Sequence, residues 1–201
     1  MDELLHLPLR LAPNRVYRFY KGGGLMDRFR GLPDPEDTMF PEDWVGSATP
    51  AINPPEHTYE GEGLSTIEVG GKPYVIADLL KERPDEIAGA RIVERYGVTT
   101  ALLVKLLDAG SRLPVHVHPT RDLARQIFDS QFGKAEAWYI VSTRQIEGAP
   151  SPRIWLGFRD DVSPEQLRSW IIEQDTEAIR GAMNEVEVEA GDAVFVRPGL
   201  L

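Results

Sequence analysis

The sequence predicts a mainly β fold built from many short strands. Glycine and proline together make up 34 of the 201 residues, or about 17% against a usual figure of about 12%, so turns are frequent. Between these turns, short aliphatic or alternating runs recur, the clearest being Val186 to Glu189. Aromatic and aliphatic residues are spread along the whole chain, which favours a folded protein over disorder. At this length a single domain is expected.

Residues 1–60 are expected to form a strand-and-arm segment that packs on the rest of the chain. Val16 to Tyr20 has the aromatic alternation of a strand, and a turn is expected at Gly22 to Gly24. Six prolines between Gly31 and Pro55 exclude a long regular element. Phe40 and Trp44 lie within this stretch and favour an ordered arm over a flexible linker.

Residues 61–201 are expected to contain most of the strands. Gly70-Gly71, flanked by two apolar tripeptides, predicts a hairpin. The aliphatic run from Thr99 to Leu107 predicts a buried strand, and Pro114 to His118 predicts another. Further strands are expected over Ala137 to Ser142 and Arg153 to Phe158, joined by a loop that bears Gly148, Pro150 and Pro152.

Two helical insertions are expected near residues 120–129 and 163–181. Thr120 caps the first, and Ser163, followed by a proline at the first helical position, caps the second. A final strand over residues 193–196 follows a turn at Gly191 and is expected to return along the strand before it.

Composition narrows the classes of function. The net charge of −10 argues against a broad nucleic-acid surface, which needs clustered lysine and arginine. The chain has no cysteine, which excludes disulfides, thiolate zinc sites and cysteine nucleophiles. No signal peptide or apolar run of membrane-spanning length is visible. We therefore expect a cytoplasmic protein with no nucleic-acid or membrane partner.

The candidate metal ligands begin with His116 and His118. On a strand, residues two apart point the same way, with alpha carbons roughly 6.5 Å apart, so the two imidazoles can converge on one ion. This pattern alone is a weak signal. Glu136 opens the next expected strand, and Gly191 leads through five residues into a Pro-Gly turn; together these spacings resemble the two motifs of the cupins.

A closer resemblance is to the type I mannose-6-phosphate isomerases, which are cupins. The segment Leu-Pro-Val-His-Val-His-Pro at residues 113–119 is similar to that family's Leu-Ser-Val-Gln-Val-His-Pro, and Gly-Lys-Ala-Glu-Ala-Trp-Tyr at 133–139 to its Gly-Lys-Thr-Glu-Ala-Trp-Tyr. Residues 42–47, 104–109 and 156–158 are also similar. The resemblance runs patchily from about residue 15 to residue 201 and corresponds to the amino-terminal portion of that family.

The resemblance implies a fold, a cofactor and a reaction. The fold is a single cupin or jelly-roll β-barrel domain over residues 1–201, and the cofactor is one zinc ion. His116, His118 and Glu136 fall on three of the family's four ligand positions, and the fourth falls on the position after Leu201. The reaction is the interconversion of mannose 6-phosphate and fructose 6-phosphate.

Three further residues are candidates for contact with the sugar phosphate. Lys134 lies two residues before Glu136 and shares its face, and the resemblance implies a role in proton transfer. Lys105 lies within an apolar strand, where its ammonium group needs water or an anion such as phosphate. Trp44 is a candidate wall of the substrate pocket.

Two other functions remain open from the sequence. One is a non-catalytic or degenerate cupin that binds a metal or a sugar phosphate, and the other is a cupin enzyme of a different reaction, such as a sugar epimerase or dioxygenase. The position of the fourth ligand further leads us to expect an incomplete enzyme, truncated before its last strands. Such a chain would have little turnover and would associate through an open sheet edge.

Overall fold

The computed structural model describes residues 8–144, 151–159 and 161–201. Its contacts divide the chain into two compact units, residues 1–113 and 114–201, and each is described by itself. Gly148 and Pro150 of the expected loop lie outside the described residues. The single cupin-type domain over residues 1–201 stays a prediction.

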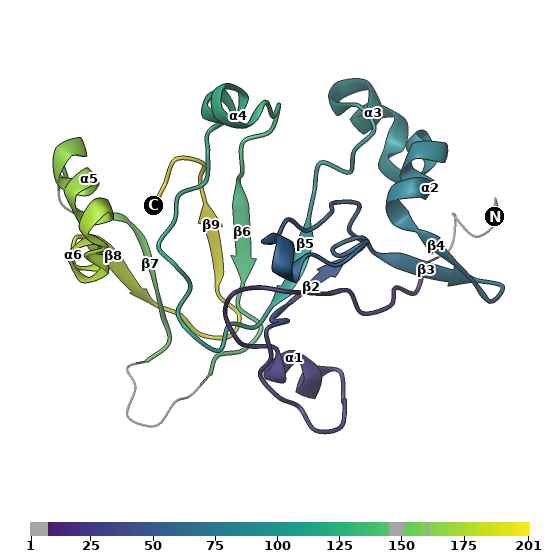
Figure 1. Cartoon of the computed structure of the whole chain (residues 1–201), viewed down its shortest axis with the longest axis horizontal. Helices are drawn as coiled ribbons and strands as arrows, with labels where there is room; N and C mark the ends of the chain where they lie inside the picture. Colours follow the sequence, from purple (N-terminus) through teal and green to yellow (C-terminus); the bar gives the residue numbers. More distant parts are fainter. Residues whose placement is uncertain (1–7, 145–150, 160) are drawn as a thin grey trace. The chain divides into compact units, whose positions relative to one another are not determined.

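The first unit contains a three-stranded antiparallel sheet and a hairpin (Figure 1). The sheet has the order β1-β2-β5, formed by β1 (Arg15–Val16), β2 (Glu42–Val45) and β5 (Val104–Leu107). The hairpin pairs β3 (Thr66–Val69) with β4 (Lys72–Val75). Its turn is Gly70-Gly71, and both residues have positive φ, at 58° and 76°, a conformation that glycine adopts without strain. The predicted hairpin is confirmed.

Helices accompany these strands. They are α1 (Gly24–Phe29), η2 (Pro55–His57), α2 (Ile76–Glu82), the π-helical turn η3 (Asp85–Gly89) and α3 (Ala90–Tyr96). Ile67 of the hairpin packs with Ile76 and Leu79 of α2 in a small buried core. Residues 31–55 were expected to form an ordered arm, and they include β2, which is the middle strand of the three-stranded sheet.

Two expectations for the first unit are corrected. The strand expected over Val16 to Tyr20 is limited to β1. The strand expected from Thr99 begins only at Val104, and the preceding Leu102 is 69% exposed rather than buried. This strand pairs with β2 alone, so it lies at an edge of the three-stranded sheet. In addition, the structure has a helix that the sequence analysis did not predict, α3, which follows Pro84.

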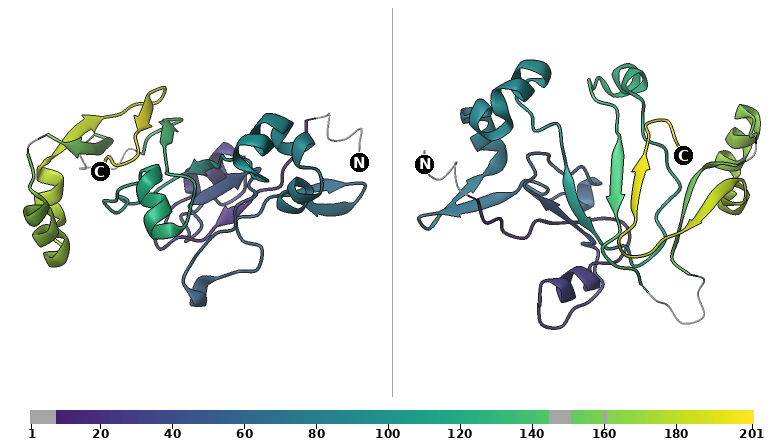
Figure 2. Two further views of the ribbon diagram at one scale, coloured as in Figure 1. Left: turned by 90° about the horizontal axis from the view of Figure 1, so that it is seen from above. Right: turned by 180° about the vertical axis from the view of Figure 1, so that it is seen from behind.

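Within its described residues, the second unit is built from two strand pairs and three helices. The pairs join β6 (Glu136–Tyr139) to β9 (Ala193–Val196), and β7 (Arg153–Phe158) to β8 (Met183–Glu187). The helices are α4 (Arg121–Phe128), α5 (Pro164–Glu173) and α6 (Thr176–Gly181). Figures 1 and 2 show that β6 begins and β9 ends at the end of their pair nearest α4.

The helix starts predicted in the second unit are confirmed. The Thr120 hydroxyl accepts a hydrogen bond from Leu123 N, and the Ser163 hydroxyl accepts one from Gln166 N. The Asp175 carboxylate accepts one from Ala178 N at the start of α6. Each side chain satisfies a backbone donor that has no partner within its helix.

Two strand expectations for the second unit are wrong. Pro114 to His118 is not a strand, and the Pro114 and Pro119 nitrogens have no hydrogen to donate to a ladder. The segment is instead held by single backbone bonds: Gly199 N donates to His118 O at 2.8 Å, and Lys134 N donates to Pro119 O at 3.0 Å. In addition, β9 does not return along β8, because each pairs with another strand.

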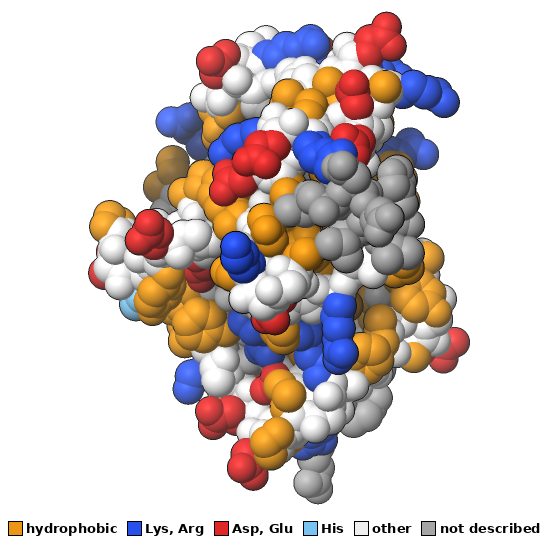
Figure 3. All heavy atoms as spheres, turned by 90° about the vertical axis from the view of Figure 1, so that its right-hand side faces the viewer, with side chains coloured by type: hydrophobic (Ala, Val, Ile, Leu, Met, Phe, Trp, Pro, Cys, Tyr) orange, Lys and Arg blue, Asp and Glu red, His pale blue; other side chains and the backbone are white. Residues whose placement is uncertain are grey.

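The described strands therefore form short antiparallel sheets accompanied by helices, and closure into a jelly-roll barrel stays a prediction. On the face shown in Figure 3, acidic and basic side chains are interspersed with hydrophobic ones. Within the described part of the chain, no helix has the length and apolar character needed to cross a membrane.

Gly133 offers a test of the close backbone approach before β6. A Cβ at this position would lie 2.7 Å from Arg121 N and 2.9 Å from Pro119 O, both backbone atoms. We expect Gly133→Ala to lower the free energy of unfolding by about 1–3 kcal/mol, the cost typical of overpacking. Urea denaturation at neutral pH measures it.

Gly181→Ala is the matched control, because the added Cβ would meet nothing within 4 Å on α6. Alanine is favoured over glycine in helices, so this variant should be unchanged or slightly more stable. Equal stability of the two variants would contradict the proposed close approach.

Candidate functional site

His118, Lys134 and Glu136 come together in the second unit, and we call these three residues the Glu136 cluster. The Glu136 Oε2 atom lies 3.2 Å from His118 Nε2 and 3.6 Å from Lys134 Nζ. The His118 side chain is 6% exposed, that of Glu136 is 26% exposed and that of Lys134 is 48% exposed. One carboxylate oxygen thus contacts both an imidazole and an ammonium group.

The backbone explains how residues 16 or more positions apart reach one another here. Glu136 opens β6, and the alternation of a strand places Lys134, two residues earlier, toward the same side. His118 comes from the preceding coil, which is fixed to the stretch before β6 by the Lys134 N to Pro119 O bond. The bond from Gly199 N to His118 O ties the same coil to the turn that follows β9.

His116 lies beside this cluster without joining it. The centroid of its ring is 5.1 Å from that of the His118 ring, and His116 is an exposed residue. The His116 Nδ1 atom is 2.8 Å from Pro114 O. A backbone carbonyl at this distance orients the ring and leaves Nε2 as the atom that can bind a metal.

The donor set has the chemistry that zinc takes, since imidazole nitrogen and carboxylate oxygen are both common zinc ligands. His118 and Glu136 are close enough for one ion to contact both, and His116 is the nearest further imidazole. Across the residues that the structure describes, however, no group of three or more histidine, aspartate or glutamate side chains is arranged to hold a metal ion. The three-ligand set of His116, His118 and Glu136 therefore stays a prediction.

A second cluster surrounds a buried carboxylate in the first unit, and we call it the Glu42 cluster. Glu42 and Trp44 lie two apart on β2 and share a face, while Lys105 lies opposite Trp44 on β5. Glu42 Oε2 accepts hydrogen bonds from Trp44 Nε1 at 2.7 Å and from Lys105 Nζ at 3.1 Å. Its Oε1 accepts one from the Tyr20 hydroxyl at 2.7 Å and lies 3.2 Å from Arg18 Nε.

These contacts keep Glu42 ionised although its side chain is only 6% exposed. Burial by itself raises the pKa of this carboxyl. The Lys105 ammonium, the Trp44 and Tyr20 donors and the Arg18 guanidinium oppose that effect and bring the pKa down to about 2. Burial and the bond to Glu42 in turn raise the pKa of the Tyr20 phenol. The cluster is therefore a charged, hydrogen-bonded network at neutral pH.

Two cationic side chains lie over the Trp44 ring. The Lys105 ammonium is 4.7 Å from the ring centroid, and the Arg18 guanidinium carbon is 5.0 Å from it. Both distances are within the range of cation–π attraction. Trp44 is buried, so its contribution here is to support these two cations.

Sequence reasoning singled out Lys105 and Trp44 but missed Glu42, Arg18 and Tyr20. A signal for Glu42 was available, because a glutamate two residues from a tryptophan shares its face on a strand. A lysine in an apolar strand also requires a nearby anion. Nothing in the sequence indicated that Arg18 and Tyr20, more than 20 positions before β2, would face the same carboxylate.

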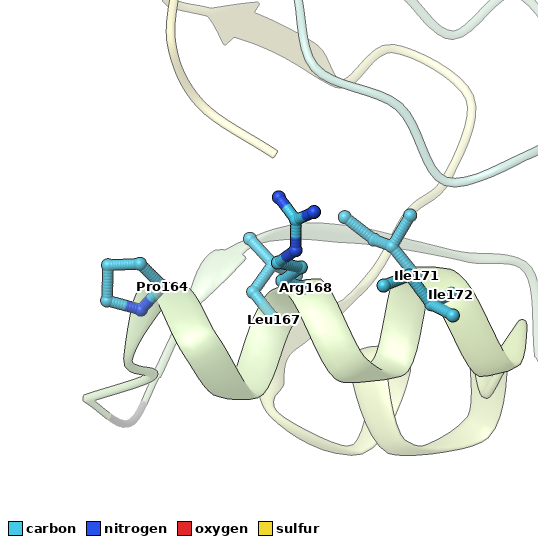
Figure 4. Close-up of a pocket in the computed structure, with 5 residues that line it drawn as sticks. All are labelled: Pro164, Leu167, Arg168, Ile171 and Ile172. Atoms are coloured by element: carbon cyan, nitrogen blue, oxygen red, sulfur yellow. The ribbon is translucent and has the colours of Figure 1, made fainter.

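A separate hollow runs along α5 in the second unit (Figure 4). Its lining residues are Pro164, Leu167, Arg168, Ile171 and Ile172. They include none of the candidate site residues, and all of them come from one helix. The hollow is mostly apolar and offers no group for acid–base or metal chemistry.

Comparisons with known proteins bear on both clusters. No protein-family model matches the chain. A Bacillus subtilis protein named "probable mannose-6-phosphate isomerase" is 29% identical over 194 residues, which is 96% of this chain and 53% of the relative. The Streptococcus mutans mannose-6-phosphate isomerase gives the same identity and coverage. The crystal structure of the Bacillus subtilis mannose 6-phosphate isomerase matches with a TM-score of 0.68 at 25% identity, over 96% of this chain and 53% of that one.

The resemblance to the mannose-6-phosphate isomerases is confirmed. The match extends over both compact units, so it includes the segments of the Glu42 and Glu136 clusters. The chain spans about half the length of the mannose-6-phosphate isomerases that it matches.

The Glu42 cluster predicts a pH-dependent contribution to stability. The pKa of Glu42 falls from about 4.5 to about 2 on folding, so its contribution is present above about pH 4.5 and is lost as the pH falls through about 2. A shift of this size corresponds to about 3 kcal/mol at pH 7 and to about half of that at pH 3. We expect Glu42→Gln to be much less stable than the native chain at pH 7, with the difference narrowing at pH 3.

Guanidinium denaturation at both pH values measures this difference. Glu68→Gln, on the exposed side of β3 in the same unit, is the control and should change stability little. A Glu42→Gln deficit that is the same at pH 7 and pH 3 would show that the carboxylate charge is not its cause.

Proposed function

We propose that this chain provides the metal-site portion of a zinc-dependent aldose–ketose isomerase that interconverts mannose 6-phosphate and fructose 6-phosphate on a cupin-type barrel. The observation that carries the proposal is the Glu136 cluster. The two motifs that resemble the isomerases, residues 113–119 and 133–139, meet there through His118, Lys134 and Glu136. The identity to mannose-6-phosphate isomerases along both units supports the same conclusion.

The proposed reaction moves a proton between two neighbouring carbons of the open-chain sugar. The proton leaves C2 and returns to C1 through an enediol, and the oxygens on both carbons change their charge during the step. His116, His118 and Glu136 would hold the zinc ion. When bound, zinc supplies a Lewis acid that stabilises the negative charge developing on these oxygens.

Lys134 is the proposed catalytic residue. Its ammonium group lies 3.6 Å from Glu136, and its side chain is about half exposed, so it can reach a sugar placed against the cluster. There it would donate a proton or a hydrogen bond to a substrate oxygen.

Lys105 and Trp44 are the proposed substrate-binding residues in the first unit. The Glu42 carboxylate and the Trp44 ring hold the Lys105 ammonium in place. An ordered ammonium group attracts a phosphate dianion without first losing side-chain freedom. Trp44 serves in this proposal as the wall on which Lys105 lies.

The alternative is a protein that binds a metal or a sugar phosphate without turnover. One observation favours it, namely that within the described residues no group of three donors is arranged for a metal ion. A two-donor pair holds a divalent ion loosely, with water in the remaining positions, and a loosely held ion gives a poorly ordered catalytic centre.

The substrate proposal is tested by a coupled assay of fructose 6-phosphate formation from mannose 6-phosphate. A complete version of this protein should turn over, lose activity with a chelator and regain it with zinc, whereas residues 1–201 alone should show little turnover. Lys134→Ala should lower kcat by about 100-fold or more, the scale of a lost general acid or base. Lys105→Ala should mainly raise KM for the phosphorylated sugar. Binding of mannose 6-phosphate without any turnover would favour the alternative.

The metal proposal is tested by equilibrium dialysis against zinc followed by metal analysis. His118→Ala removes an imidazole that contacts Glu136, so its zinc affinity should fall at least 10-fold. His57→Ala is the control, because His57 stacks on Tyr17 in the first unit and has no proposed metal role. Full zinc content in His118→Ala would remove this residue from the ligand set.

A further inference from the structure

The Glu136 carboxylate uses one oxygen, Oε2, for both contacts of its cluster. His118 Nε2 approaches that atom to 3.2 Å and Lys134 Nζ approaches it to 3.6 Å. Oε2 is also the Glu136 atom that faces His118, so an ion held between the imidazole and the carboxylate would bind there. The ammonium group therefore stands at an oxygen that the metal needs.

We propose that Lys134 balances the charge of Glu136 in the metal-free chain and competes with the divalent ion for that carboxylate, so that it limits metal affinity and is released when the ion binds. This inference rests on the metal site of the proposed function. It assigns Lys134 a second role, which is exercised before any substrate is present.

The burial of the three side chains makes this exchange feasible. His118 is nearly fully buried and is fixed through its own backbone carbonyl by Gly199. Lys134 is the most exposed of the three, with a side chain that is 48% exposed. An ion pair with so exposed a lysine is weak and is easily replaced. The ammonium group can therefore swing into water while His118 and Glu136 stay in place.

Two effects then act in the same direction on metal affinity. The ion must displace the ammonium group from Glu136, and it is also repelled by the ammonium charge nearby. Removing the charge of Lys134 should remove both effects. For a half-exposed pair, the expected gain in affinity is about threefold to tenfold.

The exchange also links metal loading to the availability of Lys134. While the metal is absent, the ammonium group is paired with Glu136 and is directed toward the carboxylate. Once the ion takes over that oxygen, the ammonium group is free to contact a sugar oxygen. The proposed catalytic lysine would thus be released by the same event that completes the metal centre.

Isothermal titration of the whole 201-residue chain with Zn²⁺, at one pH and low ionic strength, tests the inference without measuring activity. Lys134→Met should bind zinc about threefold to tenfold more tightly than the native chain. Lys134→Arg keeps the charge and should bind within about twofold of it. Arg125→Met is the matched control, because it removes an exposed cation of α4 that pairs with Asp122; it should also stay within twofold.

A second pair of variants separates competition at Glu136 from general repulsion. In a Glu136→Gln background, Lys134→Met should change zinc affinity by less than twofold, because the shared carboxylate is gone. Unchanged or weaker binding by Lys134→Met in the native background would overturn the inference, as would the same gain in both backgrounds.

The outcomes also separate this inference from the proposed function. Absence of zinc binding in every variant would overturn both the inference and the zinc part of the proposal. Zinc binding with the expected gain in Lys134→Met, but no isomerase turnover by a complete version of the protein, would overturn only the proposed reaction and leave the inference supported.

Discussion

The close backbone approach between Pro119 and the Gly133-Lys134 step is the constraint on which the candidate site depends. No strand ladder holds the His118 segment, so its position relative to β6 is set by a few single bonds, above all that from Lys134 N to Pro119 O. Gly133 allows this bond because its missing side chain leaves room for the Pro119 and Arg121 backbone atoms. A larger residue would separate the coil from β6 and move His118 away from Glu136.

In the first unit, three residues of the Glu42 cluster are brought together by strand pairing rather than by a close backbone approach. There, regular strand pairing places Glu42, Trp44 and Lys105 on one face, since β2 and β5 are directly hydrogen-bonded. The buried carboxylate is then stabilised by donors and cations rather than by a local backbone contact. Removing one partner from such a network leaves charge uncompensated inside the protein, which costs far more than the net strength of the pair.

Local signals in the sequence predicted much of the secondary structure correctly. The Gly70-Gly71 hairpin and the capped starts of α4 and α5 each depend on residues within a few positions of one another. Strand pairing between distant segments was less accessible. The expected return of β9 along β8 followed from an adjacent turn, whereas β9 pairs with β6, more than 50 residues earlier.

The candidate site shows the same division between local and distant information. The contact between Lys134 and Glu136 could be predicted, because strand alternation places residues two apart on the same side. The reason given for His116 and His118, a strand, was wrong, yet His118 reaches Glu136 through contacts that periodicity does not encode. Arg18 and Tyr20 were missed because their approach to Glu42 depends on how the segment before β2 returns to the sheet.

The two lysines that carry the proposed function differ most in how firmly they are held. Lys105 pairs with a carboxylate that is 6% exposed, lies on a tryptophan ring and belongs to a network with Tyr20 and Arg18. Lys134 pairs with a carboxylate that is 26% exposed and is itself about half exposed. Water screens the second pair far more than the first. A fixed ammonium group such as that of Lys105 suits the binding of a phosphate, which stays the same during the reaction. A mobile ammonium group such as that of Lys134 suits a step in which it leaves one partner, Glu136, for another. The difference in burial between Glu42 and Glu136 thus agrees with the two roles proposed for otherwise similar lysine–carboxylate pairs, substrate binding for Lys105 and proton transfer for Lys134.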